Sequence, residues 1–565
     1  MSTTEKSNEK RCERDGREKV DKFRRFLAQF CATTVENLLL FDMGLCHSFP
    51  FIIIAALTGF PNKHNLNETL SLTPIEASWL ASIGYISEPI GSLLSALITD
   101  ALGRKVAMMV VNIPLVVAWF LMYSASSVWQ IFLAIVLLGL GAGLMESPII
   151  TYVGEISEPT FRGVMIAYTH FGYSLGAILV ATLNIMMPWR MVGLVCMFTP
   201  IFTTIALCFV PETPLWLLSK NKTAQAEKAL CWLRGWVPKE SVAEELQSLQ
   251  RYSERYKSCE SCIKKDQKCI HPLPTLAEKL KELKRKQTLK PFSIVMALFC
   301  ISVFSTTFSM STYIVQILKA YNIPMEPDEA AAVLSYVNNL GNISFLCLIR
   351  FTGKRYLYLT ILSILFLSAA VICGYGFMVL PIGYSSFPDL SPNFPLENSN
   401  LGYIPFVCII LSSFCIFCGI NSMAWQMISE VFPYKTRGTA TGLTAALSYV
   451  LSFIGAKTFY SLETTLSMPG VALFNCIIIA FGLILMYKIL PETENRTLED
   501  IEMHFSDNSK KLTDRKIPKL DLSQIGSAKN NSNMPTRPVS IKGIDEQNNK
   551  KSGIGCDNRS FVADS

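Results

Sequence analysis

The chain has 565 residues, of which 50% are hydrophobic and 17% are charged, and its mean hydropathy is +0.34. A water-soluble protein of this length could not solvate so apolar a composition, which excludes a soluble protein and predicts one that crosses a membrane several times. We interpret the formal net charge of +7 as membrane topology and contact with lipid headgroups, and we expect no nucleic-acid partner.

The chain begins with a hydrophilic segment over residues 1–30 that is rich in lysine and arginine. It is too long and too charged for a cleavable signal peptide, so we expect the first apolar span to serve as the insertion signal. Composition then divides the chain into an apolar region over 31–210, a polar loop over 211–290, a second apolar region over 291–490 and a polar tail over 491–565. Since a span needs about 20 apolar residues, we expect about twelve transmembrane helices in two bundles.

The run from Trp79 to Lys105 is an apolar segment dense in small residues that ends abruptly in charged ones. Gly91 and Ser95 lack bulk, so they allow another helix to approach closely where lipid gives no hydrophobic incentive to associate. Gly103 permits the positive φ of a tight turn at the end of the helix. We therefore predict a close helix contact along this span and a sharp cytosolic turn after it.

Basic residues recur in alternate loops between the apolar segments, whereas the opposite loops are poor in lysine and arginine. The positive-inside rule therefore predicts that both termini are cytosolic. Asn67 begins an Asn-Glu-Thr sequon in the first outside loop, so it is the predicted glycosylation site.

The polar loop over 211–290 has apolar residues at helical spacing around Ala226, Leu230 and Leu233, which predicts short amphipathic cytosolic helices. The loop also contains four residues of the types that bind zinc, Cys259, Cys262, Cys269 and His271. The step from Cys269 to His271 is shorter than the usual spacing, so we expect no metal site. The tail is rich in polar residues, and we expect most of it to be disordered.

Acidic and basic residues recur at corresponding places in the two halves, as in a repeated architecture. A Glu precedes an Arg by seven residues in both halves, and a Pro-Glu-Thr step closes each half. We expect these groups to pair at the cytosolic ends and to act as a gate; solvated surface pairs, the alternative, would contribute only about 0–1 kcal/mol each. The predicted gating residues are Asp100, Arg104, Glu155, Arg162, Glu212, Glu430, Arg437 and Glu492. The second half carries Arg350 where the first has Asp100, which predicts a weaker set there.

Several segments together resemble the sugar porter family of the major facilitator superfamily, and most of all its facilitated trehalose transporters of the insect type. They are GSLLSALITDALGRK, SPIITYVGE with FRG, the PETP opening of the polar loop, LKPFSI with YIVQIL, WQMISEVFP with TRG, and PETENRTLEDIE. The resemblance covers about residues 30–505. It implies an all-α membrane protein with twelve transmembrane helices in two pseudo-symmetric six-helix bundles, a central sugar site and alternating access.

The same resemblance implies where a sugar would bind, and there the chain departs from the family. Positions that carry a Gln-Gln pair and an Asn in the seventh helix of relatives hold Ser302, Val303 and Phe308. Each buried amide that hydrogen-bonds to a sugar contributes on the order of 1–3 kcal/mol to the discrimination between substrates. Losing several of them should weaken or redirect the recognition of hexoses. The residues expected to line the substrate site are His170, Tyr173, Ser302, Asn338, Trp425 and Tyr449.

Three carboxylates fall inside predicted spans, where a charge costs about 2.5–3.5 kcal/mol at mid-helix. They are Asp42, Glu88 and Glu146. One interpretation is proton coupling; the other, which we favour, is that Asp42 and Glu146 are neutral or hydrogen-bonded to neighbouring helices. The position of the Arg that accompanies such an acid in proton-coupled relatives is Ile135, which favours facilitated diffusion.

The leading hypothesis is a plasma-membrane carrier that moves a small neutral sugar, trehalose or hexose-like, down its gradient by alternating access. The alternatives are a proton-coupled sugar or polyol symporter and a non-transporting nutrient sensor with a transporter fold. No G-x-S-x-G, Walker or HExxH motif occurs in a soluble segment. We therefore predict neither an enzyme nor a bound cofactor or metal.

Overall fold

The computed structural model describes the backbone of residues 3–58, 64–65, 68–256, 286–305, 311–381, 383–387, 402–432, 437–494 and 504–505. Side chains are described for the same residues except 3–21, 150, 159–164, 166–167, 169–170, 252, 254–256, 286, 350, 429 and 437–439. The predicted sequon at Asn67, the four possible zinc ligands and the tail beyond residue 505 lie outside the described residues.

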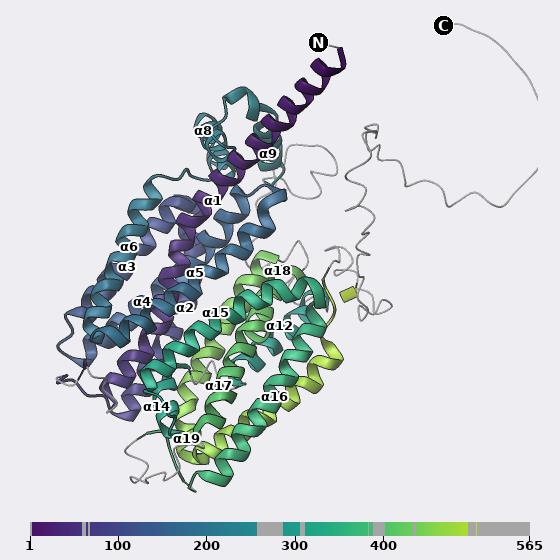
Figure 1. Ribbon diagram of the computed structural model, residues 1–565. Coiled ribbons are helices and arrows are strands. Elements are labelled where there is room, and N and C mark those ends of the chain that lie inside the picture. The colour runs from purple at the N-terminus through teal and green to yellow at the C-terminus, as the bar shows by residue number, and fades with distance from the viewer. Residues whose placement is uncertain are drawn as a thin grey trace, which may run out of the picture. The chain divides into compact units, whose positions relative to one another are not determined.

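The first half of the chain forms a bundle of long helices, coloured purple to blue in Figure 1. They are α1 (Thr3–Leu57), α2 (Pro74–Leu102), α3 (Arg104–Tyr123), α4 (Val128–Ile156), α5 (Pro159–Met186) and α6 (Trp189–Cys208). Because α1 begins at Thr3, the polar N-terminal segment continues without a break into the first span. A capping box starts α2: the Thr73 hydroxyl accepts the backbone N–H of Glu76, and the Glu76 carboxylate accepts the N–H of Thr73.

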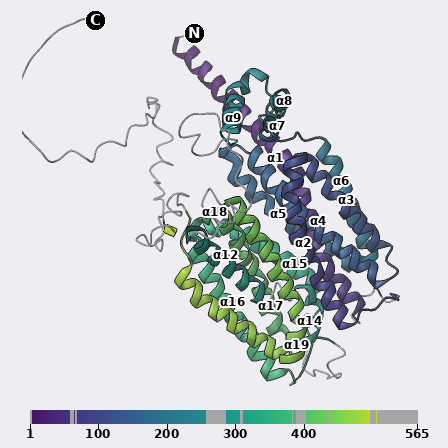
Figure 2. The same ribbon diagram turned by 180° about the vertical axis from the view of Figure 1, so that it is seen from behind.

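The second half forms a corresponding bundle, which Figure 2 shows from behind. Its seventh span is interrupted, and its tenth contains a short π-helix. The elements are α12 (Lys286–Phe304), the 3₁₀ turn η2 (Ser311–Tyr313), α14 (Ile314–Ala320), α15 (Pro327–Thr352), α16 (Lys354–Val379), α17 (Tyr403–Cys415), the π-helix η5 (Ile416–Ile420), α18 (Asn421–Val431) and α19 (Arg437–Ile489). Broken helices at membrane depth free backbone groups that can line a binding site.

Among the residues that the structure describes, ten helices are long and apolar enough to cross a membrane. Two features raise this number to twelve. The helix α5 contains a shorter apolar stretch, Phe171–Met186. The helix α19 has 53 residues, about twice what a bilayer needs, and it breaks at Ser467, whose φ is 60° and ψ is 170°. Twelve spans in two halves confirm the predicted fold class.

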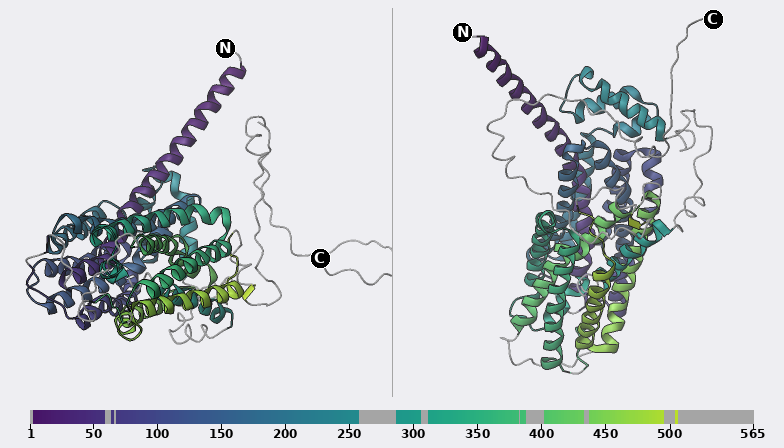
Figure 3. Two further views of the ribbon diagram at one scale, coloured as in Figure 1. Left: turned by 60° about the horizontal axis from the view of Figure 1, so that its bottom comes forward. Right: turned by 90° about the vertical axis from the view of Figure 1, so that its right-hand side faces the viewer.

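A small group of helices lies beyond the first bundle, at the end where the N-terminal part of α1 projects (Figure 3). It consists of α7 (Pro214–Ser219), α8 (Thr223–Leu233), η1 (Lys239–Val242) and α9 (Ala243–Tyr256). Buried Arg234 connects this group to the bundle, since its guanidinium lies 3.2 Å from the Glu158 carboxylate and 2.6 Å from that of Glu245. The predicted amphipathic helix around Leu230 is confirmed.

Small residues bring helices of the first bundle into backbone contact. A Cβ atom placed on Gly91 of α2 would overlap the Leu140 carbonyl oxygen of α4, and one on Gly143 would overlap the Glu88 carbonyl oxygen. Ser95 donates its hydroxyl to the Leu144 carbonyl at 2.6 Å. The predicted close contact along this span is therefore confirmed, and its partner is α4.

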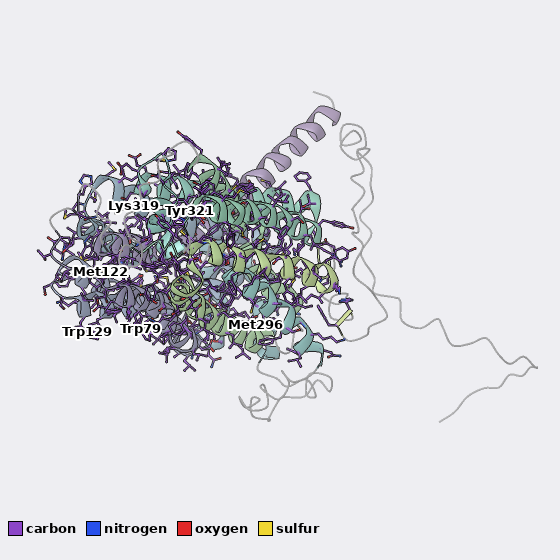
Figure 4. The ribbon with its side chains drawn as sticks, turned by 90° about the horizontal axis from the view of Figure 1, so that it is seen from below. Trp79, Met122, Trp129, Met296, Lys319 and Tyr321 are labelled. Carbon is purple, nitrogen blue, oxygen red and sulfur yellow. The ribbon has the colours of Figure 1, made fainter. Side chains whose placement is uncertain are left out.

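The outward faces of the bundles carry large apolar side chains. Figure 4, seen from the end opposite α8 and α9, shows Trp129 at the edge of the first bundle, where 81% of it is exposed. Apolar side chains turned outward around helices that satisfy their own backbone hydrogen bonds are what a bilayer requires. The chain is a multi-pass membrane protein.

Replacing Gly143 by alanine should destabilise the protein, because the added methyl group would displace α2 from α4 by overpacking, which costs about 1–3 kcal/mol. The matched control is Gly154→Ala in the same helix, where a Cβ meets nothing within 4 Å. Thermal unfolding of both variants, purified in detergent, measures the difference. Equal midpoints for the two variants would contradict the assigned contact.

Candidate functional site

The first cluster of charged residues lies at the end of the first bundle that is nearest to α7–α9, where α2, α3 and α4 meet. Arg104 begins α3, and its guanidinium donates to Glu155 Oε1 through Nη2 at 2.8 Å and through Nε at 3.1 Å. Both side chains are 13% exposed, so water screens the pair weakly. Asp100 lies 3.7 Å from the same guanidinium but is 81% exposed, so Glu155 is the main partner.

Glu212 caps the start of α3 from the chain that follows α6. Its carboxylate accepts the backbone N–H groups of Arg104 at 3.1 Å and of Lys105 at 3.0 Å. Burial raises the pKa of Glu212, while the N–H donors act in the opposite direction. A helix N-terminus carries unpaired N–H groups and a positive dipole end, which a carboxylate satisfies. Gly103, with φ of 100°, leaves room for that carboxylate.

The second half repeats this arrangement with different residues. Lys354 begins α16 and donates through Nζ to the Glu430 carboxylate of α18, and its Nζ lies 3.4 Å from Glu494. Glu492 accepts the backbone N–H groups of Lys354 and Arg355, each at 3.1 Å. Gly353 has φ of 82°, and a Cβ there would lie 2.8 Å from Glu492 Oε2. The two clusters thus follow one plan.

The structure identifies partners that the spacing of residues did not. The sequence suggested that Glu155 pairs with Arg162 and Glu430 with Arg437, but Glu155 contacts Arg104 and Glu430 contacts Lys354. The side chains of Arg162, Arg437 and Arg350 lie outside the described set. Lys354 has two acidic partners among the described residues, Glu430 and Glu494.

Hydrogen bonds between the two halves run from mid-membrane to the end opposite α7–α9. Near the middle, Asn342 of α15 donates to Ser174 of α5 at 2.7 Å. Towards the far end, the halves are joined by Asn184 with Asp328 at 2.8 Å, Thr182 with Tyr336 at 2.9 Å, Gln316 with Thr58 at 3.1 Å and Ser78 with the Lys457 carbonyl at 3.3 Å. Among the described side chains, by contrast, the contacts of each charged cluster stay within its own half.

Of the predicted substrate residues of the second half, Trp425 contacts Tyr449, and Ser302 contacts α18, the helix that carries Trp425. Trp425 of α18 packs against Phe299 of α12 and Tyr449 of α19, with ring centroids 5.3 and 6.2 Å away. Ser302 donates to Asn421 Oδ1 at 3.3 Å, so the serine that replaces an expected amide contacts a new amide on α18. Asn338 has a buried Oδ1 atom to which no described residue donates. These groups offer a ring face and hydrogen-bonding atoms, which suit a sugar.

The structure describes the predicted substrate residues of the first half less completely. The Tyr173 ring lies 5.8 Å from that of His47, whereas the His170 side chain lies outside the described set. Asp42 accepts the Thr203 hydroxyl at 3.2 Å, and Glu146 accepts that of Ser92. Two of the three acids that the sequence placed inside the membrane therefore have neutral partners, as the favoured interpretation expected.

Glu88 has a basic partner that the sequence analysis missed. His47 Nε2 lies 2.7 Å from Glu88 Oε1, and the two side chains are 14% and 3% exposed. The signal was a histidine inside the first span, but a separation of 41 residues gave no reason to pair it with Glu88. The two residues line a small pocket together with Tyr85 and Thr312.

Comparison with known proteins gives consistent results. The family model described as "Sugar (and other) transporter" matches residues 28–505. The facilitated trehalose transporter Tret1 of Apis mellifera ligustica is 26% identical over 486 residues, which cover 85% of this chain and 89% of that protein. The facilitated glucose transporter member 6 of solute carrier family 2 from Homo sapiens is 25% identical over 489 residues, covering 85% of this chain and 91% of that protein.

A solved structure shows the same fold. The inward-open conformation of the xylose transporter XylE from E. coli superposes with a TM-score of 0.63 at 15% sequence identity, covering 84% of this chain and 99% of that one.

Exchanging the charges of Lys354 and Glu430 tests the second cluster. Each single change, Lys354→Glu or Glu430→Lys, should destabilise the protein by about 3–5 kcal/mol, because like charges would then face each other in a buried site. The double variant should recover much of that loss. Unfolding midpoints of the purified variants give the coupling, and a double variant no more stable than the sum of the two single changes would contradict the pairing.

Proposed function

Because this chain belongs to the sugar transporter family, we propose that it carries a small neutral sugar or polyol across a membrane by alternating access. Trehalose and glucose are the first candidates, since similar proteins bear the names of trehalose and glucose transporters. The proposed location is the plasma membrane, with both termini cytosolic, in keeping with the positive-inside rule.

One observation carries this proposal: the halves hydrogen-bond to each other from mid-membrane outward, while each charged cluster holds helices of a single half. The outer contacts, such as Asn184 with Asp328, would then close the site on the outside and leave the cytosolic ends free to separate. The clusters at Arg104 and Lys354 would keep each bundle rigid during the movement. Rocking of one bundle against the other is how repeat-built transporters alternate their access.

The proposed substrate site lies between the halves, near Trp425, Tyr449 and Asn338. An aromatic ring can stack on the apolar face of a sugar, and amides can bond to its hydroxyls. Ser302 with Asn421 would provide a further polar contact. This cycle is common to facilitated diffusion, the mode predicted from the sequence, and to proton symport, its alternative.

Uptake of labelled trehalose and glucose into cells that express the chain tests the carrier. We expect saturable uptake that Trp425→Ala lowers about tenfold, because a lost contact of about 1.4 kcal/mol changes an equilibrium by that factor. The matched control is Trp129→Ala, since Trp129 lies on the outer face and is 81% exposed. Surface expression is matched for all three proteins. Absence of uptake from protein confirmed at the surface would favour the nutrient-sensor alternative.

Crosslinking the outer end tests alternating access. Asn184 and Asp328 belong to different halves and hydrogen-bond at 2.8 Å. With cysteines at both positions, a short bismaleimide should join the halves and abolish uptake, because the outer end could no longer open. Either single cysteine variant should retain uptake after the same treatment. Full uptake by a doubly substituted, crosslinked protein would contradict the proposed cycle.

A further inference from the structure

An acid–base pair lies inside the membrane-spanning part of the first half. His47 belongs to α1 and Glu88 to α2, and their side chains meet at 2.7 Å with little exposure. Glu88 Oε2 is buried and has no hydrogen-bond partner among the described residues. A charged group at mid-membrane costs about 2.5–3.5 kcal/mol, so such residues usually serve a function.

The pair faces a pocket that both halves of the protein build. His47, Tyr85 and Glu88 come from the first half, and Thr312 comes from the 3₁₀ turn η2 in the interrupted seventh span. A movement of one half against the other therefore changes a wall of this pocket. Water would reach the pair from one side of the membrane when the carrier is open outward and from the other side when it is open inward.

The other described titratable groups around the pair lie on six helices, and one of them is Cys196 of α6, which interacts with Cys46. Asp42 and Cys46 lie on α1, Tyr85 on α2, Glu146 on α4, Tyr173 on α5 and Tyr449 on α19. None of these described groups is a lysine or an arginine, so His47 is the base among them. The side chain of His170 on α5 lies outside the described set.

Geometry separates Glu88 from the other two intramembrane acids. The Asp42 side chain is fully buried and accepts the hydroxyl of Thr203, and it does not line the pocket. Glu146 accepts the hydroxyl of Ser92 and does not line the pocket either. Glu88 alone of the three has a partner that can itself gain and lose a proton near neutral pH.

We propose that the His47–Glu88 pair binds one proton and that this proton crosses the membrane with each sugar molecule. With Nε2–H donating to Glu88 Oε1, the incoming proton binds the lone pair of His47 Nδ1 and makes an imidazolium. The pair then changes from a net charge of −1 to zero, and release of the same proton on the other side restores −1. The proposal rests on the proposed function and assigns it the symport mode, which the sequence alone did not favour.

Neutralisation gives the proton a role in the cycle. A pair with a net negative charge is costly to move through a closed, water-free state, whereas a neutral ion pair is less so. With sugar bound, the protonated carrier would therefore change its facing more readily than the deprotonated one, and the empty carrier returns after it has released the proton. When a proton binds on one side and leaves on the other together with the sugar, the proton gradient across the membrane drives the transport of the sugar.

The test uses the full chain in proteoliposomes with the membrane potential clamped at zero. An alkaline interior should drive accumulation of labelled sugar, up to about tenfold per pH unit for one proton per sugar. Glu88→Gln and His47→Gln should abolish accumulation but retain sugar counterflow at equal pH, which shows that these variants are folded. Glu36→Gln is the matched control. Glu36 lies on α1, the helix that carries His47, and its carboxylate is buried like that of Glu88 but lies outside the pocket.

Each outcome is decisive. Counterflow without accumulation by the unaltered protein would leave the carrier function standing and overturn the proton proposal. Loss of accumulation in Asp42→Asn, with Glu88→Gln still coupled, would also overturn it.

If neither sugar undergoes counterflow, the proposed substrates are wrong, and a titration of the purified protein decides without any sugar. Between about pH 5 and 8, where histidine titrates, the unaltered protein should bind one proton more than Glu88→Gln. Equal numbers would overturn the proposal.

Discussion

A charge or a helix start that this protein removes from water needs a partner, and two carboxylates per half meet that need at the starts of α3 and α16. In the first half, Glu212 satisfies the N–H groups that start α3, and Glu155 neutralises Arg104. In the second half, Glu492 and Glu430 do the same for α16 and Lys354. The two charges of each pair lie on two different helices. Breaking a pair would therefore leave an uncompensated charge and loosen the end of that bundle.

Within a bundle and between bundles, the contacts differ in kind. Inside the first bundle, glycines such as Gly91 and Gly143 bring backbones into direct contact, which tolerates little sliding. Between the bundles, side chains such as Asn184 and Gln316 make single hydrogen bonds, which can break and form again at small cost. Rigid halves with a separable interface suit the proposed carrier, and they explain how a pocket wall at Thr312 can move relative to His47.

The candidate site was only partly predictable. Trp425 and Asn338 were expected from the resemblance, and the structure places Trp425 against Tyr449, as a shared site requires. The contact between Ser302 and Asn421 was not expected, because hydrogen bonds between helices far apart in the chain leave no periodic signal. The pairing of His47 with Glu88 was missed for the same reason. It depends on the register between α1 and α2, which is set by packing.

The sequence by itself determined that this chain spans a membrane about twelve times and that its two halves repeat one plan. These properties follow from local composition, since hydropathy, glycine and charge act within about 20 residues. Only the tertiary structure decided which charges meet: Arg104 with Glu155, Lys354 with Glu430, and His47 with Glu88. Pairing energies depend on distance and burial, and both are fixed only when helices from distant parts of the chain pack together.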